Sequence, residues 1–177
     1  MILVLDNSVG KDPLSFIDDI IRAFKKYNIP FLCVNKIQPI PKITGIVISG
    51  SSRVLSKEGP PDFNVHYLKI KVPVYGICFG CQLLGSMYGG KITHHPYVCG
   101  DYVTKPMMTK YHYCFSDHIQ LPKCAIASIV VKGKKIDTGF VFDTHVFGTI
   151  YHPEYYEKTD DMFLHFYEFC KSFKDKN

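Results

Sequence analysis

The chain has 177 residues, a length that fits one domain and is too short for two well-formed cores. Apolar residues make up 46% and charged residues 21%, which excludes disordered and fibrous classes. The net charge of +5 comes from scattered basic residues, so we expect no nucleic-acid partner. No apolar run is long enough to span a membrane, and Met1–Leu5 leads into Asp6 without the pattern of a signal peptide. Seven cysteines without regular spacing favour reduced thiols and a cytoplasmic protein.

The first half of the chain predicts an α/β architecture. Short apolar runs bounded by turn residues predict buried strands at 2–5, 30–34, 45–48 and 73–77. Apolar residues at helical spacing from Ile17 to Phe24 predict a helix that begins at Asp12-Pro13 and ends at Asn28. Residues 56–61 are expected to form a polar loop. This order favours a three-layer α/β fold with a mostly parallel sheet flanked by helices.

The second half of the chain has a different residue pattern. Segments rich in Tyr, Val, Thr, Phe and Ile predict antiparallel strands and hairpins. The expected breaks between them lie at Gly100, Pro106, Pro122 and Gly133-Lys134. A last strand is predicted at 147–151, followed by an amphipathic helix over 162–170 and a charged tail at 171–177 that should fray. We therefore expect a single domain over residues 1–177.

The segment from Gly76 to Gly80 carries the clearest chemical signal. A predicted strand ends at Ile77 and a helix follows within two residues, so Cys78 lies in a sharp strand-to-helix turn. Small neighbours let the backbone bend tightly and let a substrate approach. The partial positive charge at the helix N-terminus stabilises a thiolate, which favours Cys78 as a nucleophile. The backbone N–H of Phe79 would point into the same space and could donate to an oxyanion.

Other interpretations of this segment compete with the nucleophile. A lone cysteine is most often a buried core residue. The Cys78-x-x-Cys81 spacing also fits half a zinc site or a thioredoxin-type redox pair. Zinc is disfavoured because no second Cys or His pair stands at ribbon or finger spacing, and the thioredoxin motif does not lie between glycines. We therefore expect no metal and no cofactor, with Cys81 packing the helix.

His152-Pro153-Glu154 supplies the partners that a thiolate nucleophile needs. Such a nucleophile requires a proton shuttle, and the shuttle requires an orienting group. Pro153 is expected to hold the backbone extended, so that His152 points to the thiol and Glu154 lies behind the imidazole. Of the eight histidines, only His152 stands at a predicted strand end with a carboxylate two residues on. The sequence therefore predicts a Cys-His-Glu triad.

The elbow segment 73–84, Gly89-Gly90-Lys91-Ile92 and the His-Pro-Glu segment together resemble a class I (triad) glutamine amidotransferase domain. The resemblance is nearest to the anthranilate synthase and GMP synthetase glutaminase type and covers nearly the whole chain. Residues 2–7 resemble the family's first strand, and 46–51 resemble its oxyanion strand. The resemblance implies a flavodoxin-like fold with an antiparallel hairpin region in the second half.

The same resemblance implies a reaction. Cys78 would attack the side-chain amide carbon of L-glutamine, while His152 passes a proton to the leaving ammonia and Glu154 orients His152. Water would then hydrolyse the thioester to glutamate, and a partner synthase would receive the ammonia. The implied oxyanion hole uses backbone N–H groups of Phe79 and of Gly50 or Ser51.

Two further positions correspond to the family's substrate-binding residues. Gln82 matches the position that contacts the bound glutamine. The segment 111–114, with Tyr113 and Cys114, resembles the family's segment whose backbone holds the amino-acid end of the substrate. A plain strand with alternating aromatic side chains is the alternative for this segment.

One loop departs from the family pattern and keeps other functions open. The usual Ser-Gly-Gly-Pro is replaced by Ser49-Gly50-Ser51-Ser52, and serine lacks glycine's freedom to take positive φ. The Ser-Gly-Ser variant resembles that of stand-alone relatives that cleave γ-glutamyl peptide bonds. A γ-glutamyl peptidase with the same triad is therefore one alternative. A non-catalytic regulatory protein that retains the fold is another.

Overall fold

The structure is a computed structural model that describes residues 1–10, 14–104, 109–121, 123–131 and 133–174. The helix start expected at Asp12-Pro13 and the breaks expected at Pro106 and Pro122 lie outside the described residues. In the described part of the chain, no helix is long and apolar enough to cross a membrane.

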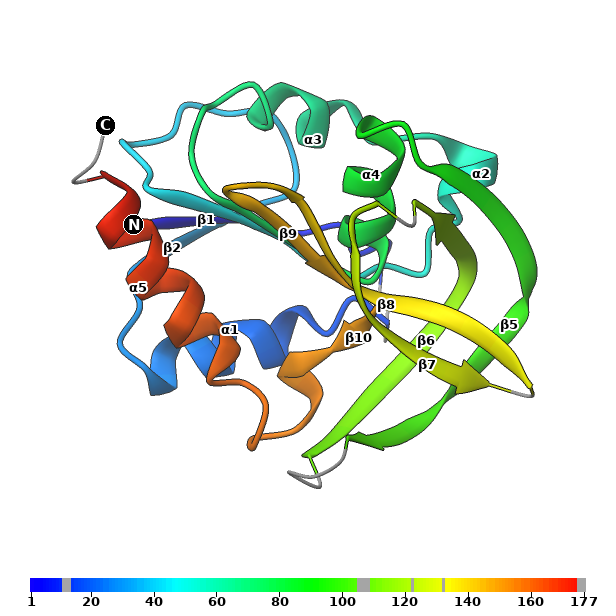
Figure 1. The fold of residues 1–177 in the computed structure, drawn as a ribbon. Helices are drawn as coiled ribbons and strands as arrows, with labels where there is room; N and C mark the ends of the chain where they lie inside the picture. Colours follow the sequence, from blue (N-terminus) through cyan, green and yellow to red (C-terminus); the bar gives the residue numbers. More distant parts are fainter. Residues whose placement is uncertain (11–13, 105–108, 122, 132, 175–177) are drawn as a thin grey trace.

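A mostly parallel sheet forms the centre of the molecule (Figure 1). Among the described residues it has seven strands in the order β2-β1-β3-β4-β9-β8-β7. Its parallel strands are β1 (Ile2–Leu5), β2 (Phe31–Val34), β3 (Gly45–Ile48), β4 (Val74–Ile77) and β9 (Val146–Thr149). The antiparallel strands β8 (Lys134–Asp143) and β7 (Ala125–Val131) extend one edge. A second, antiparallel sheet joins β10 (Tyr151–His152), β6 (Thr109–Gln120) and β5 (Lys91–Thr104).

Helices cover both faces of the central sheet, which gives the predicted three layers (Figure 1). One face carries α1 (Ile17–Lys26) and α5 (Met162–Lys174). The other face carries α3 (Asp62–Tyr67) and α4 (Phe79–Met87), and α2 (Leu55–Glu58) lies beside α4 and β5. The core strands β1, β3 and β4 are buried along their whole lengths, as expected of apolar runs covered on both sides. The predicted fold class is confirmed.

Several expected boundaries were wrong. The polar loop expected at 56–61 is wrong at its start, because helix α2 extends to Glu58. The carboxylate of Glu58 accepts the backbone N–H of Val54 at 3.0 Å, which supports the beginning of this helix. Gly100 lies inside β5 and does not end a strand. The single strand expected at 147–151 is two strands, β9 and β10, which belong to different sheets. The closing helix continues through the expected tail to Lys174, beyond which residues 175–177 are outside the described part.

Candidate active site

Cys78 lies at the tip of the central sheet, between β4 and α4. Its φ of 49° and ψ of −104° are a strained combination for a residue with a side chain. The flanking glycines make this turn possible: a Cβ on Gly76 would lie 2.6 Å from the carbonyl carbon and oxygen of Gly80. A Cβ on Gly80 would lie 2.6 Å from the backbone oxygen of Ile48. The predicted strand-to-helix turn around Cys78 is present.

His152 and Glu154 form a fully buried pair next to this turn. Nδ1 of His152 lies 2.8 Å from Oε1 of Glu154, and both residues are 0% exposed. The extended backbone expected at Pro153 is wrong, because residues Pro153–Tyr155 form a short 3-10 helix. His152 ends β10 in an extended conformation, and the 3-10 turn brings the carboxylate back towards the imidazole.

The electrostatic environment favours the charged imidazolium of His152. Burial by itself would lower the pKa of His152 below the ordinary value of 6.5. The negative charges of the Glu154 carboxylate and of a Cys78 thiolate act in the opposite direction, and the pKa of His152 is raised. The three side chains are therefore coupled electrically as well as brought together in space.

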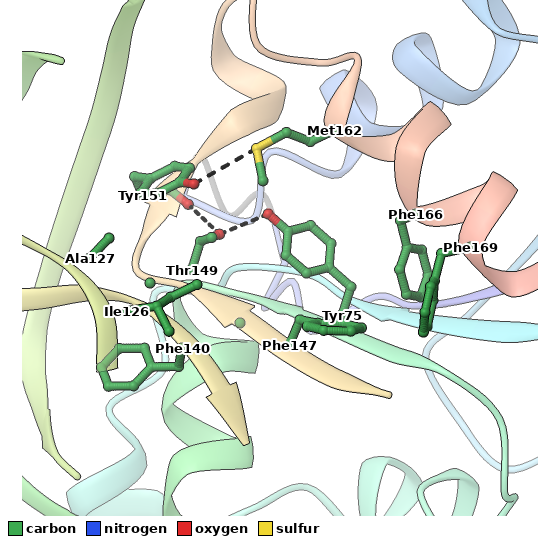
Figure 2. Close-up of a pocket in the computed structure, with 12 residues that line it drawn as sticks. Tyr75, Ile126, Ala127, Phe140, Phe147, Thr149, Tyr151, Met162, Phe166 and Phe169 are labelled. Carbon is green, nitrogen blue, oxygen red and sulfur yellow. Dashed lines mark hydrogen bonds between the residues drawn. The ribbon is translucent and has the colours of Figure 1, made fainter. Parts of the chain in front are cut away.

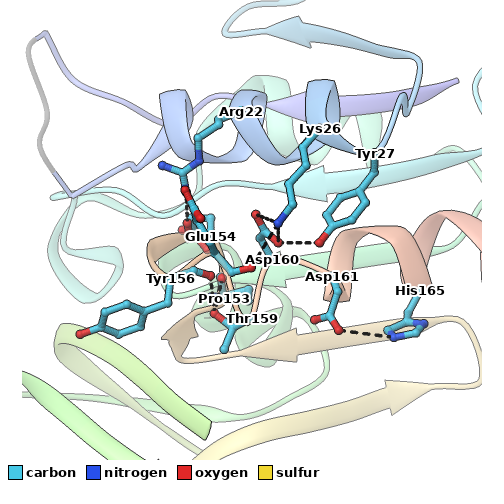
Figure 3. Close-up of polar contacts among 11 residues, drawn as sticks. Arg22, Lys26, Tyr27, Pro153, Glu154, Tyr156, Thr159, Asp160, Asp161 and His165 are labelled. Atoms are coloured by element: carbon cyan, nitrogen blue, oxygen red, sulfur yellow. Dashed lines mark hydrogen bonds and ion pairs between the residues drawn. The ribbon is translucent and has the colours of Figure 1, made fainter.

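Helix α1 supports the turn that carries His152 and Glu154 (Figure 3). Nη2 of Arg22 donates to the backbone oxygen of Glu154 at 2.9 Å. On the other side, the hydroxyl of Thr159 donates to the backbone oxygen of Pro153 at 2.6 Å. These two bonds fix the backbone on which the carboxylate stands.

A buried carboxylate ties the same segment to α1 a second time (Figure 3). Asp160 is 0% exposed, and its Oδ1 accepts from Nζ of Lys26 at 2.8 Å and from the hydroxyl of Tyr27 at 2.7 Å. A buried carboxylate requires such partners to offset its lost hydration. Residues from both ends of the chain therefore build the support of the His–Glu pair.

Gly50 lies directly against the imidazole of His152. A Cβ at position 50 would meet Cε1 of His152 at 2.8 Å and the backbone oxygen of Leu14 at 2.8 Å. Because one of these atoms is backbone, it could not move aside at low cost. Only glycine fits this position without a shift of the surrounding chain.

Ser51 is tied to the residue that follows β1. Its hydroxyl donates to the backbone oxygen of Asn7 at 2.7 Å and accepts the N–H of Arg53 at 3.1 Å. The hydroxyl of Ser49 accepts the N–H of Asn7 and donates to the oxygen of Gly50, both at 2.9 Å. Among the described residues, Ser51 is not one of the non-glycine residues with positive φ. Serine at position 51 therefore supports the loop without strain.

The thiol of Cys78 opens into a small cavity of about 40 Å³. Gln82 and Cys114 line this cavity, whereas Tyr113 is not among its lining residues. Sγ of Cys78 lies 3.3 Å from the backbone oxygen of Cys114, and the amide of Gln82 donates to the backbone oxygen of Asp117 at 2.9 Å. The space in front of the thiol of Cys78 is therefore narrow.

The segment 111–114 is part of strand β6 and has two different faces. The ring of Tyr113 packs beside Tyr102 and Phe115 and does not line the cavity. Cys114 is on the other face, buried near Cys78, and burial raises the pKa of its thiol to about 12. The segment is therefore a strand with alternating aromatic side chains that also brings a backbone carbonyl to the thiol of Cys78.

Two aromatic residues near the cavity had no signal in the sequence. The ring of Phe16, which precedes α1 and has a φ of 46°, packs against that of His152 at a centroid distance of 4.4 Å. Tyr97 lines the cavity, and its hydroxyl contacts Sγ of Cys114. Both contacts join residues that are distant in the sequence, so spacing within a motif could not reveal them.

A second cavity, of about 300 Å³, lies between the central sheet and α5 (Figure 2). Its walls are mainly apolar and include Tyr75, Phe147 and Phe166. Figure 2 shows the hydroxyl of Tyr75 turned to Thr149, with 2.9 Å between their oxygens. Cys78 and His152 do not line this cavity, so we assign it no part in the chemistry.

The fold and the site define an α/β protein with a cysteine at a sharp strand-to-helix turn and a buried His–Glu pair beside it. A family model described as glutamine amidotransferase class-I matches residues 9–172. The chain therefore belongs to the class-I glutamine amidotransferase family.

Relatives with assigned functions match only part of this chain. A GMP synthase (glutamine-hydrolyzing) of Natranaerobius thermophilus is 32% identical over an alignment of 80 residues that covers 42% of this chain and 16% of that protein. The GMP synthase of Borreliella burgdorferi is 40% identical over 52 residues, which are 29% of this chain and 10% of that protein. The matched segments are thus a small share of these longer enzymes.

Solved structures match nearly the whole fold. A protein of Thermoplasma acidophilum, described as one of the subunits of a GMP synthase, has a TM-score of 0.76 at 19% identity, covering 98% of this chain and 95% of its own. The PurLQS structure of Thermotoga maritima has a TM-score of 0.68 at 15% identity, covering 95% of this chain and 97% of its own. At these identities the similarity concerns the fold.

Proposed function

We propose that this chain hydrolyses the side-chain amide of L-glutamine to glutamate and ammonia. The observation that carries the proposal is the meeting of the elbow residue Cys78 with the buried His152–Glu154 pair. Membership of the class-I glutamine amidotransferase family supports glutamine as the substrate.

In the proposed mechanism, Sγ of Cys78 attacks the amide carbon and forms a tetrahedral intermediate. His152 gives a proton to the amide nitrogen, which leaves as ammonia, and a thioester remains on Cys78. A water molecule that loses its proton to His152 then attacks the thioester, releasing glutamate and the thiol. Glu154 keeps the imidazole oriented and stabilises the imidazolium through the 2.8 Å contact.

The negative oxygen of the tetrahedral intermediate needs donors fixed in advance. We assign this role to the backbone N–H of Phe79, at the start of α4, and to an N–H of Gly50 or Ser51. The hydroxyl bonds of Ser49 and Ser51 to their surroundings hold this loop close to His152. Gln82 and the backbone at Cys114 would contact the substrate, since both line the cavity.

We further propose that the ammonia passes to a partner synthase. The two relatives described above are GMP synthases, of which the matched segments make up 16% and 10%. Ammonia is protonated in neutral water, and chemistry that uses it as a nucleophile is best coupled to its release.

A stand-alone γ-glutamyl peptidase is the second candidate, because Ser51 stands where the usual family loop has glycine. The two functions are distinguished by the product profile of the purified chain with glutamine, γ-glutamyl dipeptides and buffer alone. Release of ammonia from glutamine supports the amidotransferase. Cleavage confined to the dipeptides supports the peptidase, and no cleavage of either supports a non-catalytic protein.

A glutamine-mimicking chloroketone should label one of the seven cysteines, Cys78. This thiol lines the cavity and is coupled to the imidazole of His152. The thiol of Cys81 is fully buried, which raises its pKa well above the usual range and keeps it unreactive. Peptide mass spectrometry locates the adduct. An adduct on Cys81 or Cys99, with Cys78 unmodified, would refute the assignment.

Glu154→Gln should leave partial activity and move the alkaline limb of the kcat/KM profile to lower pH. The carboxylate of Glu154 raises the pKa of His152, so its removal lets that pKa fall. The imidazolium, which protonates the leaving ammonia, is then lost at a lower pH than in the wild type. Glu157→Gln is the matched control, because Glu157 is exposed and the same charge is removed there. Coincident alkaline limbs in wild type and Glu154→Gln would contradict the role of Glu154.

A further inference from the structure

Two thiols and an imidazole meet on the β5–β6 hairpin, beside the cavity at Cys78. Cys99 on β5 and Cys114 on β6 are direct partners across the antiparallel ladder. His112 precedes Cys114 by two residues and therefore lies on the same face of the strand. The two sulfur atoms and a ring nitrogen of His112 all lie within 4.8 Å of one another.

The spacing of these atoms fits one tetrahedral metal ion. Sγ of Cys99 lies 3.7 Å from Nε2 of His112. Zinc binds sulfur at about 2.3 Å and imidazole nitrogen at about 2.0 Å, which places two such ligands about 3.6 Å apart in a tetrahedron. The ligands stand on two paired strands, so small side-chain rotations suffice to bring all three atoms to one ion.

The ring nitrogen of His112 that does not face the sulfur atoms is held by a carboxylate, as is common for a zinc-binding histidine. Nδ1 of His112 lies 2.9 Å from Oδ1 of Asp101, which leaves Nε2 directed at the sulfur of Cys99. Asp101 is fixed in turn by Nζ of Lys110 at 3.0 Å and by the hydroxyl of Tyr156 at 2.9 Å. Zinc-binding histidines commonly donate their other N–H to a carboxylate, which fixes the tautomer and the ring orientation.

We propose that Cys99, His112 and Cys114 bind a zinc ion, with the fourth position open to solvent or to a small ligand. Two thiolates and an imidazole form a ligand set that binds Zn²⁺ in preference to Mg²⁺ or Ca²⁺. Cys99 is exposed, which gives the ion an entry path. Each thiol releases its proton to solvent when it binds the ion. The zinc proposal does not depend on the proposed hydrolysis of glutamine.

Binding of zinc would also affect the mouth of the cavity. The hydroxyl of Tyr97 contacts Sγ of Cys114 and must turn away when this sulfur binds the ion. Tyr97 is 54% exposed and stands at the β-bulge between His94 and Val98, so its ring can turn towards solvent. Because Tyr97 lines the cavity at Cys78, the zinc ion and the thiol of Cys78 share one wall.

Equilibrium dialysis of the full, reduced chain against Zn²⁺ tests the proposal. We expect one ion per chain, and X-ray absorption of the zinc should show two sulfur neighbours and one imidazole. Cys99→Ser and His112→Gln should each weaken binding by at least about 100-fold, since each removes a ligand atom. Asp101→Asn should weaken it by about 10- to 100-fold, because the carboxylate only orients His112.

Two matched variants show where the ion binds. Cys124→Ser removes a thiol outside the cluster, and Cys78→Ser removes the neighbouring thiol of the proposed catalytic site. Both should bind zinc as tightly as the wild type. Loss of binding in Cys78→Ser with full binding in Cys99→Ser would place the ion on Cys78 and overturn the proposal. An absence of binding, or a zinc spectrum without sulfur neighbours, would overturn it as well.

Discussion

Cys78→Ala should abolish glutamine hydrolysis, with kcat lowered by at least about 10⁴-fold, while the melting temperature changes little. The thiol is the proposed nucleophile, because it lies at the sharp strand-to-helix turn beside the buried His152–Glu154 pair. Its sulfur lines the cavity, and its hydrogen bond to the backbone oxygen of Cys114, at 3.3 Å, is a weak one. Alanine at this φ of 49° is no more strained than cysteine, so the elbow should persist.

The role of the imidazole is tested in the same assay. His152→Ala should cause a loss of similar size, because the thiolate and the imidazolium act as one unit. Steady-state release of ammonia from glutamine gives kcat for each variant, and calorimetry gives the melting temperature. An unfolded Cys78→Ala chain would assign the residue a structural role.

Cys81→Ala is the matched control, only three positions along the chain. Cys81 is fully buried, and a Cβ on Gly148 would lie 2.6 Å from its sulfur, so its side chain packs tightly between α4 and β9. Its removal should lower the melting temperature, because it leaves a cavity in the core, and should preserve most of the activity. If Cys81→Ala were inactive and Cys78→Ala active, the assignment of the nucleophile would be wrong.

Features that depend on neighbours in the sequence were predictable. The turn around Cys78 was predictable from Gly76 and Gly80. A Cβ on either glycine would collide with nearby backbone, of Gly80 in the same turn or of Ile48 in the neighbouring strand. The buried strands β1, β3 and β4 were predictable because parallel strands covered on both faces read as continuous apolar runs.

Features that depend on pairing between distant segments were not predictable in this way. The extended backbone expected at Pro153 is a 3-10 turn, because the turn is held by Arg22 and Thr159, which the tripeptide itself does not contain. Zinc was disfavoured for the Cys78-x-x-Cys81 spacing because no second Cys or His pair stands at ribbon or finger spacing, and the zinc site that we propose does not use that spacing. The register of β5 against β6 instead places Cys99 opposite Cys114, which are fifteen positions apart.

The purified chain should be a slow glutaminase whose active site is closed by Tyr97. The cavity at Cys78 measures about 40 Å³. Pockets for drug-sized ligands measure about 300 Å³ or more, so we expect a wall of this narrow cavity to move when glutamine binds. Tyr97 is the most exposed aromatic side chain in that wall, and its hydroxyl contacts Cys114. A synthase that docks here and draws Tyr97 away would couple the release of ammonia to its use.

Tyr97→Ala should therefore raise kcat/KM for glutamine by roughly tenfold or more. If the open state makes up about 0.1–10% of the population, removal of the closing side chain recovers a factor of about 10 to 1,000. Tyr97→Phe is the matched variant: it keeps the bulk of the ring and loses the contact with Cys114. A phenylalanine variant as slow as the wild type assigns the closure to bulk, and one as fast as Tyr97→Ala assigns it to the hydroxyl contact. Steady-state kinetics without added protein decides whether Tyr97 closes the active site. A wild-type kcat above about 1 s⁻¹, together with a lower kcat/KM in Tyr97→Ala, would contradict the closure. It would show that Tyr97 binds the substrate instead.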